Sequence, residues 1–231
     1  METSKDVVRK SSAFPVWQGY KVAAISDVHG FSNKDIDDWF DKNSGEILLF
    51  AGDLQYARDD TGTSFLNWFS SLPFIHKVMT FGNHDFNYKE ITVEAEKYGN
   101  IHVLNNKSVI LSGLKIFGSP YSLPFGPWEF MVPEEELAVM YSKIEPDTDI
   151  ILTHGPPYGI LDESVYNRKK VNAGSRSLLK AIDGLPELKA SVFGHIHEGY
   201  GVWWNDRGTQ FVNASLLNER YEPKNLPLWV I

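Results

Sequence analysis

The chain has 231 residues, of which 42% are hydrophobic and 23% charged, and its formal net charge is -8. This composition supports a sizeable folded core and excludes a fibrous or disordered chain, while the acidic balance gives no general attraction for long nucleic acids or for an anionic membrane. The absence of cysteine excludes disulfides, thiolate zinc sites and cysteine nucleophiles, and it is typical of a reducing compartment.

The length predicts one domain spanning residues 1–231. The apolar runs are far shorter than a membrane-spanning helix needs, and the polar start METSKDVVRK lacks the apolar segment of a signal peptide. We therefore expect a cytoplasmic protein that has no membrane partner.

The periodicity of apolar residues predicts a chain in which strands and helices alternate first and bare strands follow. This order favours an α/β (α+β) fold, with β-α-β units that form a mixed sheet and hairpins that complete a second sheet. The loop 119–133 holds four prolines and four aromatic residues, and it is either a rigid lid or a packed surface loop. Strands are predicted at 20–25, 47–50, 76–81, 109–111, 115–117, 149–152, 190–193, 201–204, 210–212 and 228–231, and helices at 35–42, 63–71, 89–98, 133–141 and 175–182.

Five short blocks place candidate metal-binding side chains directly after predicted strands. Ligands bind at the carboxyl ends of strands in α/β sheets, and residues two apart in extended backbone project to the same side. Each block alone is compatible with an ordinary turn or a core histidine, but five such blocks in one chain favour a site. The blocks are Ser26-Asp27-Val28-His29-Gly30, Gly52-Asp53-Leu54, Gly82-Asn83-His84-Asp85, Thr153-His154-Gly155-Pro156-Pro157 and Gly194-His195-Ile196-His197.

The histidines supply the second argument for a metal centre. Five of the seven lie in these blocks with Asp or Asn beside or between them, whereas His76 and His102 do not and are interpreted as structural. Oxygen and imidazole donors without sulfur suit Mn, Fe, Zn or related divalent ions. Seven such ligands with one shared carboxylate suit two ions about 3.5–4 Å apart, as in phosphoryl transfer.

The ordered blocks D-x-H, G-D, G-N-H-D, H-G and G-H-x-H resemble the calcineurin-like metallophosphoesterases over nearly the whole chain, from Val22 to Ser215 within a core of about residues 20–215. The stretches LTHGPPYGILD, VFGHIHEGYG and FVNAS are most similar to the animal metallophosphoesterase-domain-containing proteins and their microbial relatives, a phosphodiesterase branch. Some mammalian members of that branch have glycine where this chain has His195. The resemblance implies a four-layer α-β-β-α sandwich of two mixed β-sheets flanked by helices, with a metal cluster along one edge.

The resemblance also implies residue roles. Two divalent ions are expected, with Mn as the first candidate and Fe, Zn, Ni, Co or Mg as alternatives, and a water that bridges them is the expected nucleophile. His84, oriented by Asp85, would stabilise the developing charge or protonate the leaving oxygen. The expected ligands are Asp27, His29 and His197 for the first ion, Asn83, His154 and His195 for the second, and Asp53 as the bridge.

We therefore expect a two-metal phosphodiesterase of small phosphodiesters or cyclic nucleotides, and a small phosphoester as its partner. The alternative that uses the same metal site is a phosphomonoesterase. A nuclease is also an alternative, but the acidic charge balance disfavours it. The alternative from another class of function is a non-catalytic scaffold that binds metal.

Several further residues have two interpretations. The family has an Asp-Arg pair soon after G-D that this chain lacks, and Arg58 or Asp59 either replaces its contacts or does not. Glu198 either orients a histidine or is a surface residue. Gly174 and Ser175 either donate to phosphate or begin a helix. Tyr158, Trp128 and Phe125 either stack on a nucleobase or pack, and the basic residues at 168–170 form an exposed turn or attract an anionic substrate.

Overall fold

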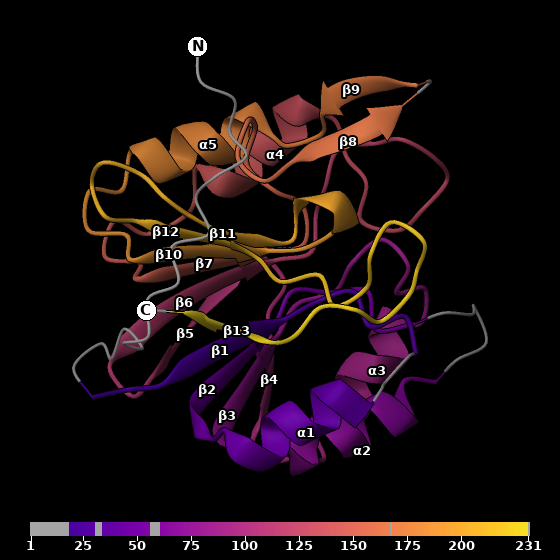
Figure 1. Cartoon of the computed structure of the whole chain (residues 1–231). Helices are drawn as coiled ribbons and strands as arrows, with labels where there is room; N and C mark the ends of the chain where they lie inside the picture. The colour runs from indigo at the N-terminus through magenta and orange to yellow at the C-terminus, as the bar shows by residue number, and fades with distance from the viewer. Residues whose placement is uncertain (1–18, 31–33, 56–60, 167, 231) are drawn as a thin grey trace.

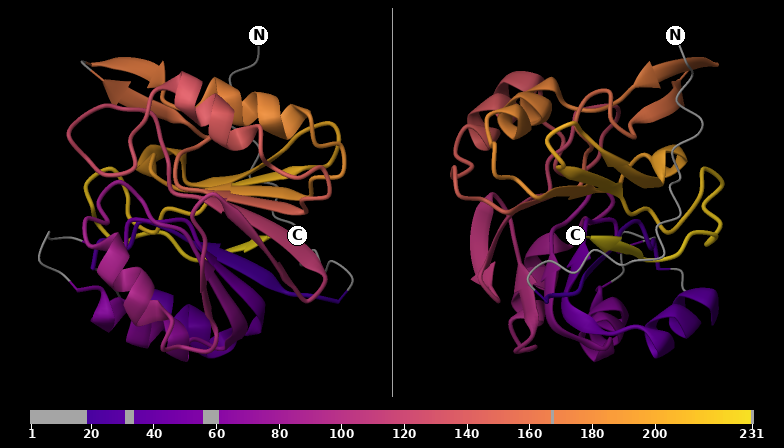
Figure 2. Two further views of the ribbon diagram at one scale, coloured as in Figure 1. Left: turned by 180° about the vertical axis from the view of Figure 1, so that it is seen from behind. Right: turned by 60° about the vertical axis from the view of Figure 1, so that its left-hand side comes forward.

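A computed structural model describes residues 19–30, 34–55, 61–166 and 168–230. Two β-sheets lie face to face, and helices cover the outer face of each (Figures 1 and 2). The first sheet has the order β13-β1-β2-β3-β4; the strands β1 to β4 are parallel to one another, and β13 is antiparallel to β1. Its strands are β1 (Val22–Ile25), β2 (Gly45–Phe50), β3 (Phe74–Met79), β4 (Ile101–Val103) and β13 (Leu228–Val230).

The second sheet has the order β11-β12-β10-β7-β6-β5, in which the four central strands are parallel and both edge strands are antiparallel to their neighbours. Because β7 and β10 are adjacent and parallel, the blocks that follow them emerge at the same edge. The strands are β5 (Lys107–Leu111), β6 (Leu114–Ser119), β7 (Ile150–Thr153), β10 (Ala190–Phe193), β11 (Gly201–Trp204) and β12 (Gln210–Asn213).

Three helices pack on the outer face of the first sheet and two on that of the second (Figure 1). In the first of them, Ile36 and Phe40 are one turn apart and both are buried against the sheet. The fifth begins at Ser175, whose Oγ accepts a hydrogen bond from Leu178 N at 3.1 Å, as an N-cap does. The helices are α1 (Lys34–Lys42), α2 (Thr63–Ser71), α3 (Tyr88–Ala95), α4 (Glu134–Tyr141) and α5 (Arg176–Asp183).

The core has three apolar layers, and the side-chain alternation of the strands assigns residues to them. Along β1, Val22 and Ala24 face the layer between the sheets, whereas Ala23 and Ile25 face α1–α3. All four are buried, as expected for a parallel strand that is covered on both faces. These layers confirm the four-layer α-β-β-α sandwich. Among the residues that the structure describes, no helix is long and apolar enough to cross a bilayer.

A two-stranded hairpin and a short helical turn complete the described elements. The hairpin consists of β8 (Glu163–Tyr166) and β9 (Lys169–Asn172), and the 3-10 turn η1 is His197–Gly199. The sequence pattern predicted neither β8, β9 nor β4; the other predicted elements match within three residues at each end. The predicted end of the last strand, Ile231, lies outside the described residues, as do Arg58 and Asp59.

Candidate metal centre

The loops after β1 and β2 are joined by backbone hydrogen bonds at the shared edge of the first sheet. Asp27 N donates to Gly52 O at 2.9 Å, and His29 N donates to Asp53 O at 3.0 Å. These bonds continue the strand pairing beyond the strand ends. They place the Asp27, His29 and Asp53 side chains next to one another, as the spacing predicts.

Four candidate ligands have left-handed backbone conformations, which non-glycine residues rarely adopt. The φ angles are 52° for Asp27, 44° for His29, 61° for Asp53 and 69° for His195. Such conformations cost free energy and cluster at functional sites, where the surrounding structure holds them. The loops therefore have a geometry that directs these side chains to one place.

The Asp85 carboxylate contacts main-chain groups and not the His84 ring that it was expected to orient. Its carboxylate accepts hydrogen bonds from the backbone N–H groups of Gly82, Asp53, Leu54 and Gln55, at 2.7, 3.0, 2.9 and 3.2 Å. Both carboxylate oxygens are thus occupied by main-chain donors rather than by the His84 ring. Asp85 fixes the loop that carries Asp53, and we correct the expectation that it orients the His84 imidazole.

The first group of possible ligands is Asp27, His29 and His197, whose donor atoms lie within 4.8 Å of one another. His197 Nε2 lies 3.4 Å from Asp27 Oδ1. The Nδ1 atom of His197 donates to Asn218 O at 2.9 Å, and that of His29 donates to Gln55 O at 3.3 Å. Because Nδ1 is used as a donor to main chain in both rings, each Nε2 faces the group.

The second group consists of Asp53, His154 and His195, and their donor atoms also lie within 4.8 Å of one another. Asn83 belongs to this group, because its Oδ1 lies 2.9 Å from His154 Nε2. The Nδ1 atom of His154 donates to Ala51 O at 2.8 Å. His154 and His195 follow strands of the second sheet, whereas Asp53 and Asn83 follow strands of the first.

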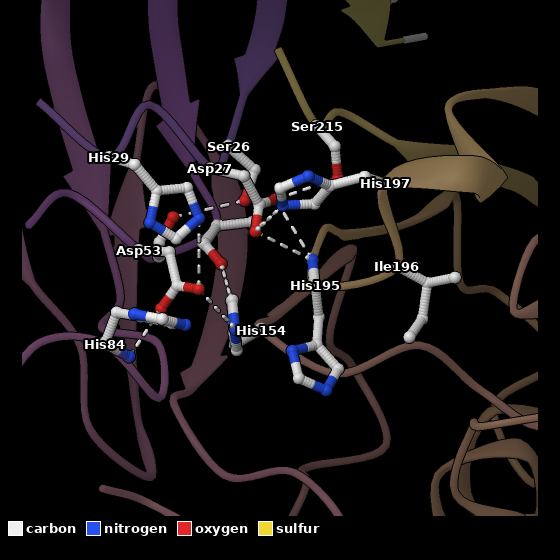
Figure 3. Close-up of polar contacts among 12 residues, drawn as sticks. Ser26, Asp27, His29, Asp53, His84, His154, His195, Ile196, His197 and Ser215 are labelled. Carbon is white, nitrogen blue, oxygen red and sulfur yellow. Dashed lines mark hydrogen bonds and ion pairs between the residues drawn. The ribbon is translucent and has the colours of Figure 1, made fainter. Parts of the chain in front are cut away.

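Asp53 lies between the two groups. Its Oδ2 atom is 3.6 Å from His29 Nε2 and 3.5 Å from His154 Nε2, while its Oδ1 accepts a hydrogen bond from His84 N at 2.8 Å (Figure 3). One carboxylate therefore faces imidazoles of both groups, which is the placement that the sequence analysis expects of a bridging ligand.

The charges of the centre shift the pKa values of its members strongly. Burial opposes ionisation of Asp27, but the hydrogen bond from His197 and the positive charges of His197 and His154 outweigh it and hold the pKa of Asp27 below its ordinary value. The pKa of His197 rises to about 9, since contact with Asp27 outweighs burial. Burial and the charge of His154 lower the pKa of His195 to about 3. Anionic oxygens and imidazoles thus alternate in a buried site.

These residues fit divalent cations by an observation independent of the motifs. Among the described side chains, His29 Nε2 is buried without a hydrogen-bond partner, and buried polar atoms normally have one. The three rings anchored through Nδ1 present Nε2 to the carboxylates, an arrangement typical of metal-binding histidines, whose other nitrogen binds a main-chain or carboxylate acceptor. Figure 3 shows the polar ends of Asp27, His29, Asp53 and His154 gathered at one point.

His84 lies beside the two groups and packs against a residue of the 119–133 loop. Its ring is half-buried, meets the His29 ring edge-on at 4.8 Å between centroids, and lies 4.3 Å from the Trp128 ring at 33°. Glu129 N donates to Asn83 O at 3.1 Å, and the Phe130 ring stacks on Phe81. This part of the loop is therefore packed against the metal centre.

Sequence reasoning missed several residues that hold the centre. Ser215 Oγ donates to Asp27 Oδ2 at 2.8 Å, and the Tyr221 ring lies 5.0 Å from the rings of both His29 and His197. The motif FVNAS contains Ser215, but nothing in the sequence places it against Asp27. Asn218 contributes a backbone carbonyl, which any residue type could supply.

The remaining residues singled out in the sequence contact other protein groups or lie exposed outside the two groups of ligands. Glu198 accepts a hydrogen bond from Ser164 Oγ at 3.2 Å, and the Arg176 guanidinium lies 3.5 Å from the centre of the Tyr158 ring. His102 on β4 and His76 on β3 contact each other, with 3.4 Å between His102 Nε2 and His76 Nδ1. Gly174 N donates to Asp162 Oδ2, so this amide is already bound, and the basic residues at 168–170 are exposed on the hairpin.

The chain is similar to a family model, to two curated proteins and to a solved structure. Residues 20–199 match the family model described as calcineurin-like phosphoesterase. The chain is 30% identical over 237 residues to metallophosphoesterase domain-containing protein 1 of Homo sapiens, and equally to that of Mus musculus, covering 91% of this chain and 70% of each relative. One solved crystal structure, 18% identical, covers 84% of this chain and 89% of its own with a TM-score of 0.64, a likeness of fold.

Proposed function

Because the chain belongs to the calcineurin-like phosphoesterase family, we propose that it is a two-metal hydrolase of small phosphodiesters. The observation that carries the proposal is the Asp53 carboxylate, which faces His29 and His154 from two groups of ligands at once. A shared carboxylate brings two cations close enough to act on one phosphoryl group.

We assign the ligands in the way that the family resemblance implies. In this proposal Asp27, His29 and His197 hold one cation, Asn83, His154 and His195 hold the other, and Asp53 binds both. Divalent cations held there, Mn²⁺ first among them, would act as Lewis acids on the phosphoryl oxygens and would lower the pKa of water for attack on phosphorus. Since ligands come from both sheets, we also propose that the whole chain is one catalytic domain.

His84 is the residue that we place beside the reacting ester. Its main chain donates to Asp53 Oδ1, its ring packs against the rings of His29 and Trp128, and the residue is partly exposed, so substrate can reach it. An imidazole there can donate a hydrogen bond to an oxygen of the phosphoryl group or to the leaving oxygen. In this proposal water is the nucleophile, and no serine or threonine among the described residues is assigned that role.

The first test is hydrolysis of a chromogenic phosphodiester and the matching monoester by metal-stripped protein, before and after addition of Mn²⁺. We expect turnover only after Mn²⁺ is added, with kcat/KM larger for the diester. A larger value for the monoester would move the proposal to a phosphomonoesterase. Failure of both substrates in protein that binds two ions per chain would contradict a general phosphoesterase and favour the scaffold.

Trp128 gives a second expected result. Because its ring lies against one face of His84, we expect Trp128→Ala to lower kcat about tenfold through loss of imidazole positioning, with little change in KM, and Trp128→Phe to retain most of the activity. Trp204→Ala, on the exposed face of β11, is the matched control. Equal losses in the Ala and Phe variants, or a change confined to KM, would show that Trp128 does not position His84.

A further inference from the structure

A cavity of about 600 Å³ lies against His195 and His197. Its other walls come from the 119–133 loop, from the β8–β9 hairpin and from the loop that follows β12. The volume lies within the range of small-molecule pockets in proteins. A group attached to a phosphorus atom at the metal centre can therefore extend directly into this cavity.

Part of the wall is apolar and carries side chains that are unusually exposed for their type. Phe125 and Val165 are each 61% exposed, Tyr221 is 44% exposed and Val171 is 38% exposed, and all four line the cavity. Exposed apolar side chains that gather in one place mark a binding surface, whereas scattered ones do not. The cavity thus offers apolar contact to a ligand.

The two aromatic walls also contact the candidate ligands of the metals. The Phe125 ring lies 5.3 Å from the His195 ring, and the Tyr221 ring lies 5.0 Å from the His197 ring. The aromatic walls are therefore adjacent to the metal centre. The atoms bonded to an ester oxygen of a phosphoryl group at the centre would contact Phe125 or Tyr221.

Tyr221 is held in place by the same residue that orients His197. Its φ is 58°, in the left-handed region, and its N–H donates to Asn218 O at 2.9 Å. The same carbonyl accepts the bond from His197 Nδ1, while Asn218 Oδ1 accepts N–H bonds from Arg220 and Glu222. This rigid loop fixes the Tyr221 ring relative to the metal ligand and retains a strained backbone.

Apart from the candidate metal ligands His195 and His197, the cavity is lined by carboxylates and by no basic side chain among the described residues. Glu198 and Glu219 line it, and the described residues that line it include no lysine or arginine. Lys170, on the hairpin, is paired with Glu163. A second anionic group on a ligand, placed beyond the metal ligands, would meet these carboxylates without a compensating lysine or arginine, which disfavours its binding.

We propose that this cavity binds the organic group of the substrate and that it selects an apolar, uncharged group over a second anionic one. Phe125 and Tyr221 are the specificity-determining walls, and Glu198 and Glu219 disfavour substrates that carry a further phosphate or carboxylate. The substrate class is then a phosphoester with one anionic centre and an apolar or aromatic substituent. The assignment rests on the proposed function for the place of the phosphoryl group.

The test is calorimetric binding of three phosphonates to the metal-loaded protein: methylphosphonate, phenylphosphonate and 4-carboxyphenylphosphonate. They share one head group and differ in the group that would enter the cavity. We expect phenylphosphonate to bind at least about tenfold more tightly than methylphosphonate, because a few apolar carbons change binding by that factor, and the carboxyphenyl ligand to bind about tenfold more weakly than the phenyl ligand.

Substitutions of the cavity-lining side chains test whether these side chains cause the differences in phosphonate affinity. Phe125→Ala and Tyr221→Ala should each bring the ratio of the phenyl to the methyl dissociation constant towards one, whereas Ile110→Ala, equally exposed on β5 but outside the cavity, should leave it unchanged. The combination of Glu198→Gln and Glu219→Gln should remove the penalty on the carboxyphenyl ligand. These substitutions are at the cavity surface, and circular dichroism checks that each variant is folded.

The outcomes separate the two proposals. Equal affinity for the phenyl and methyl ligands, or a preference that both alanine variants retain, overturns the cavity assignment, even if the protein hydrolyses simple diesters. The expected preference in a protein that hydrolyses no ester supports the cavity and contradicts the proposed function. Failure of all three phosphonates to bind contradicts both.

Discussion

Replacement of Asp53 by asparagine is expected to lower kcat/KM for a phosphodiester at least about a thousandfold while the protein remains folded. Asparagine keeps the shape of the side chain and the acceptor for His84 N, but it removes the negative charge that faces His29 and His154. A shared anionic ligand affects both proposed cations at once, and a loss of several kcal/mol of charge stabilisation corresponds to a rate factor of about that size.

The measurements for this variant are kcat/KM with Mn²⁺, metal content per chain and circular dichroism. Asp41→Asn, an exposed carboxylate on α1, controls for the loss of one negative charge. A folded Asp53→Asn protein with wild-type turnover would contradict the bridging role and, with it, the arrangement on which the proposed function rests.

Substitution of Gly82 by alanine is the second change for which we expect a large effect. A Cβ atom at this position would lie 2.6 Å from His154 Cε1 and 2.7 Å from Asp53 N, and it would come closer still to Asp53 Oδ1. Backbone of the Asp53 loop cannot move aside without moving a ligand. We therefore expect at least about a hundredfold loss of kcat/KM, because displacements of about 1 Å cost that much, and a loss of about 2 kcal/mol in the free energy of unfolding.

Activity assays and urea denaturation measure both effects. Gly99→Ala is the matched control, since a Cβ there meets nothing within 4 Å and the residue is exposed. If Gly82→Ala is as active as Gly99→Ala, the close approach of the two loops is not required for the centre.

The sequence predicts the position of the centre well because its signals are local. A strand that ends in small residues followed by Asp or His identifies a ligand-bearing loop, and parallel strands gather such loops at one edge. The pairing of strands into two sheets could not be read from these signals, because pairing depends on contacts between distant segments. That topology came from the family resemblance, which the structure confirms.

The elements that escaped prediction have physical reasons for it. The described side chains of β9 are all exposed, and none of the described side chains of β8 is buried, so no alternation of buried apolar and exposed polar residues marks the hairpin. Strand β4 has only three residues, too few to show a period. The place of Asp85 depends on backbone N–H groups, which every residue except proline carries, and no pattern of residue types indicates such partners.

The division of the ligands between the two sheets has a consequence for the order of folding. Asp27, His29, Asp53 and Asn83 follow strands of the first sheet, whereas His154, His195 and His197 follow strands of the second. Neither sheet supplies the full ligand set proposed for either ion, so high-affinity metal binding would require that both sheets have formed and docked. Ions bound there would link the two sheets late in folding, and the free energy of unfolding would then rise in proportion to the logarithm of metal concentration.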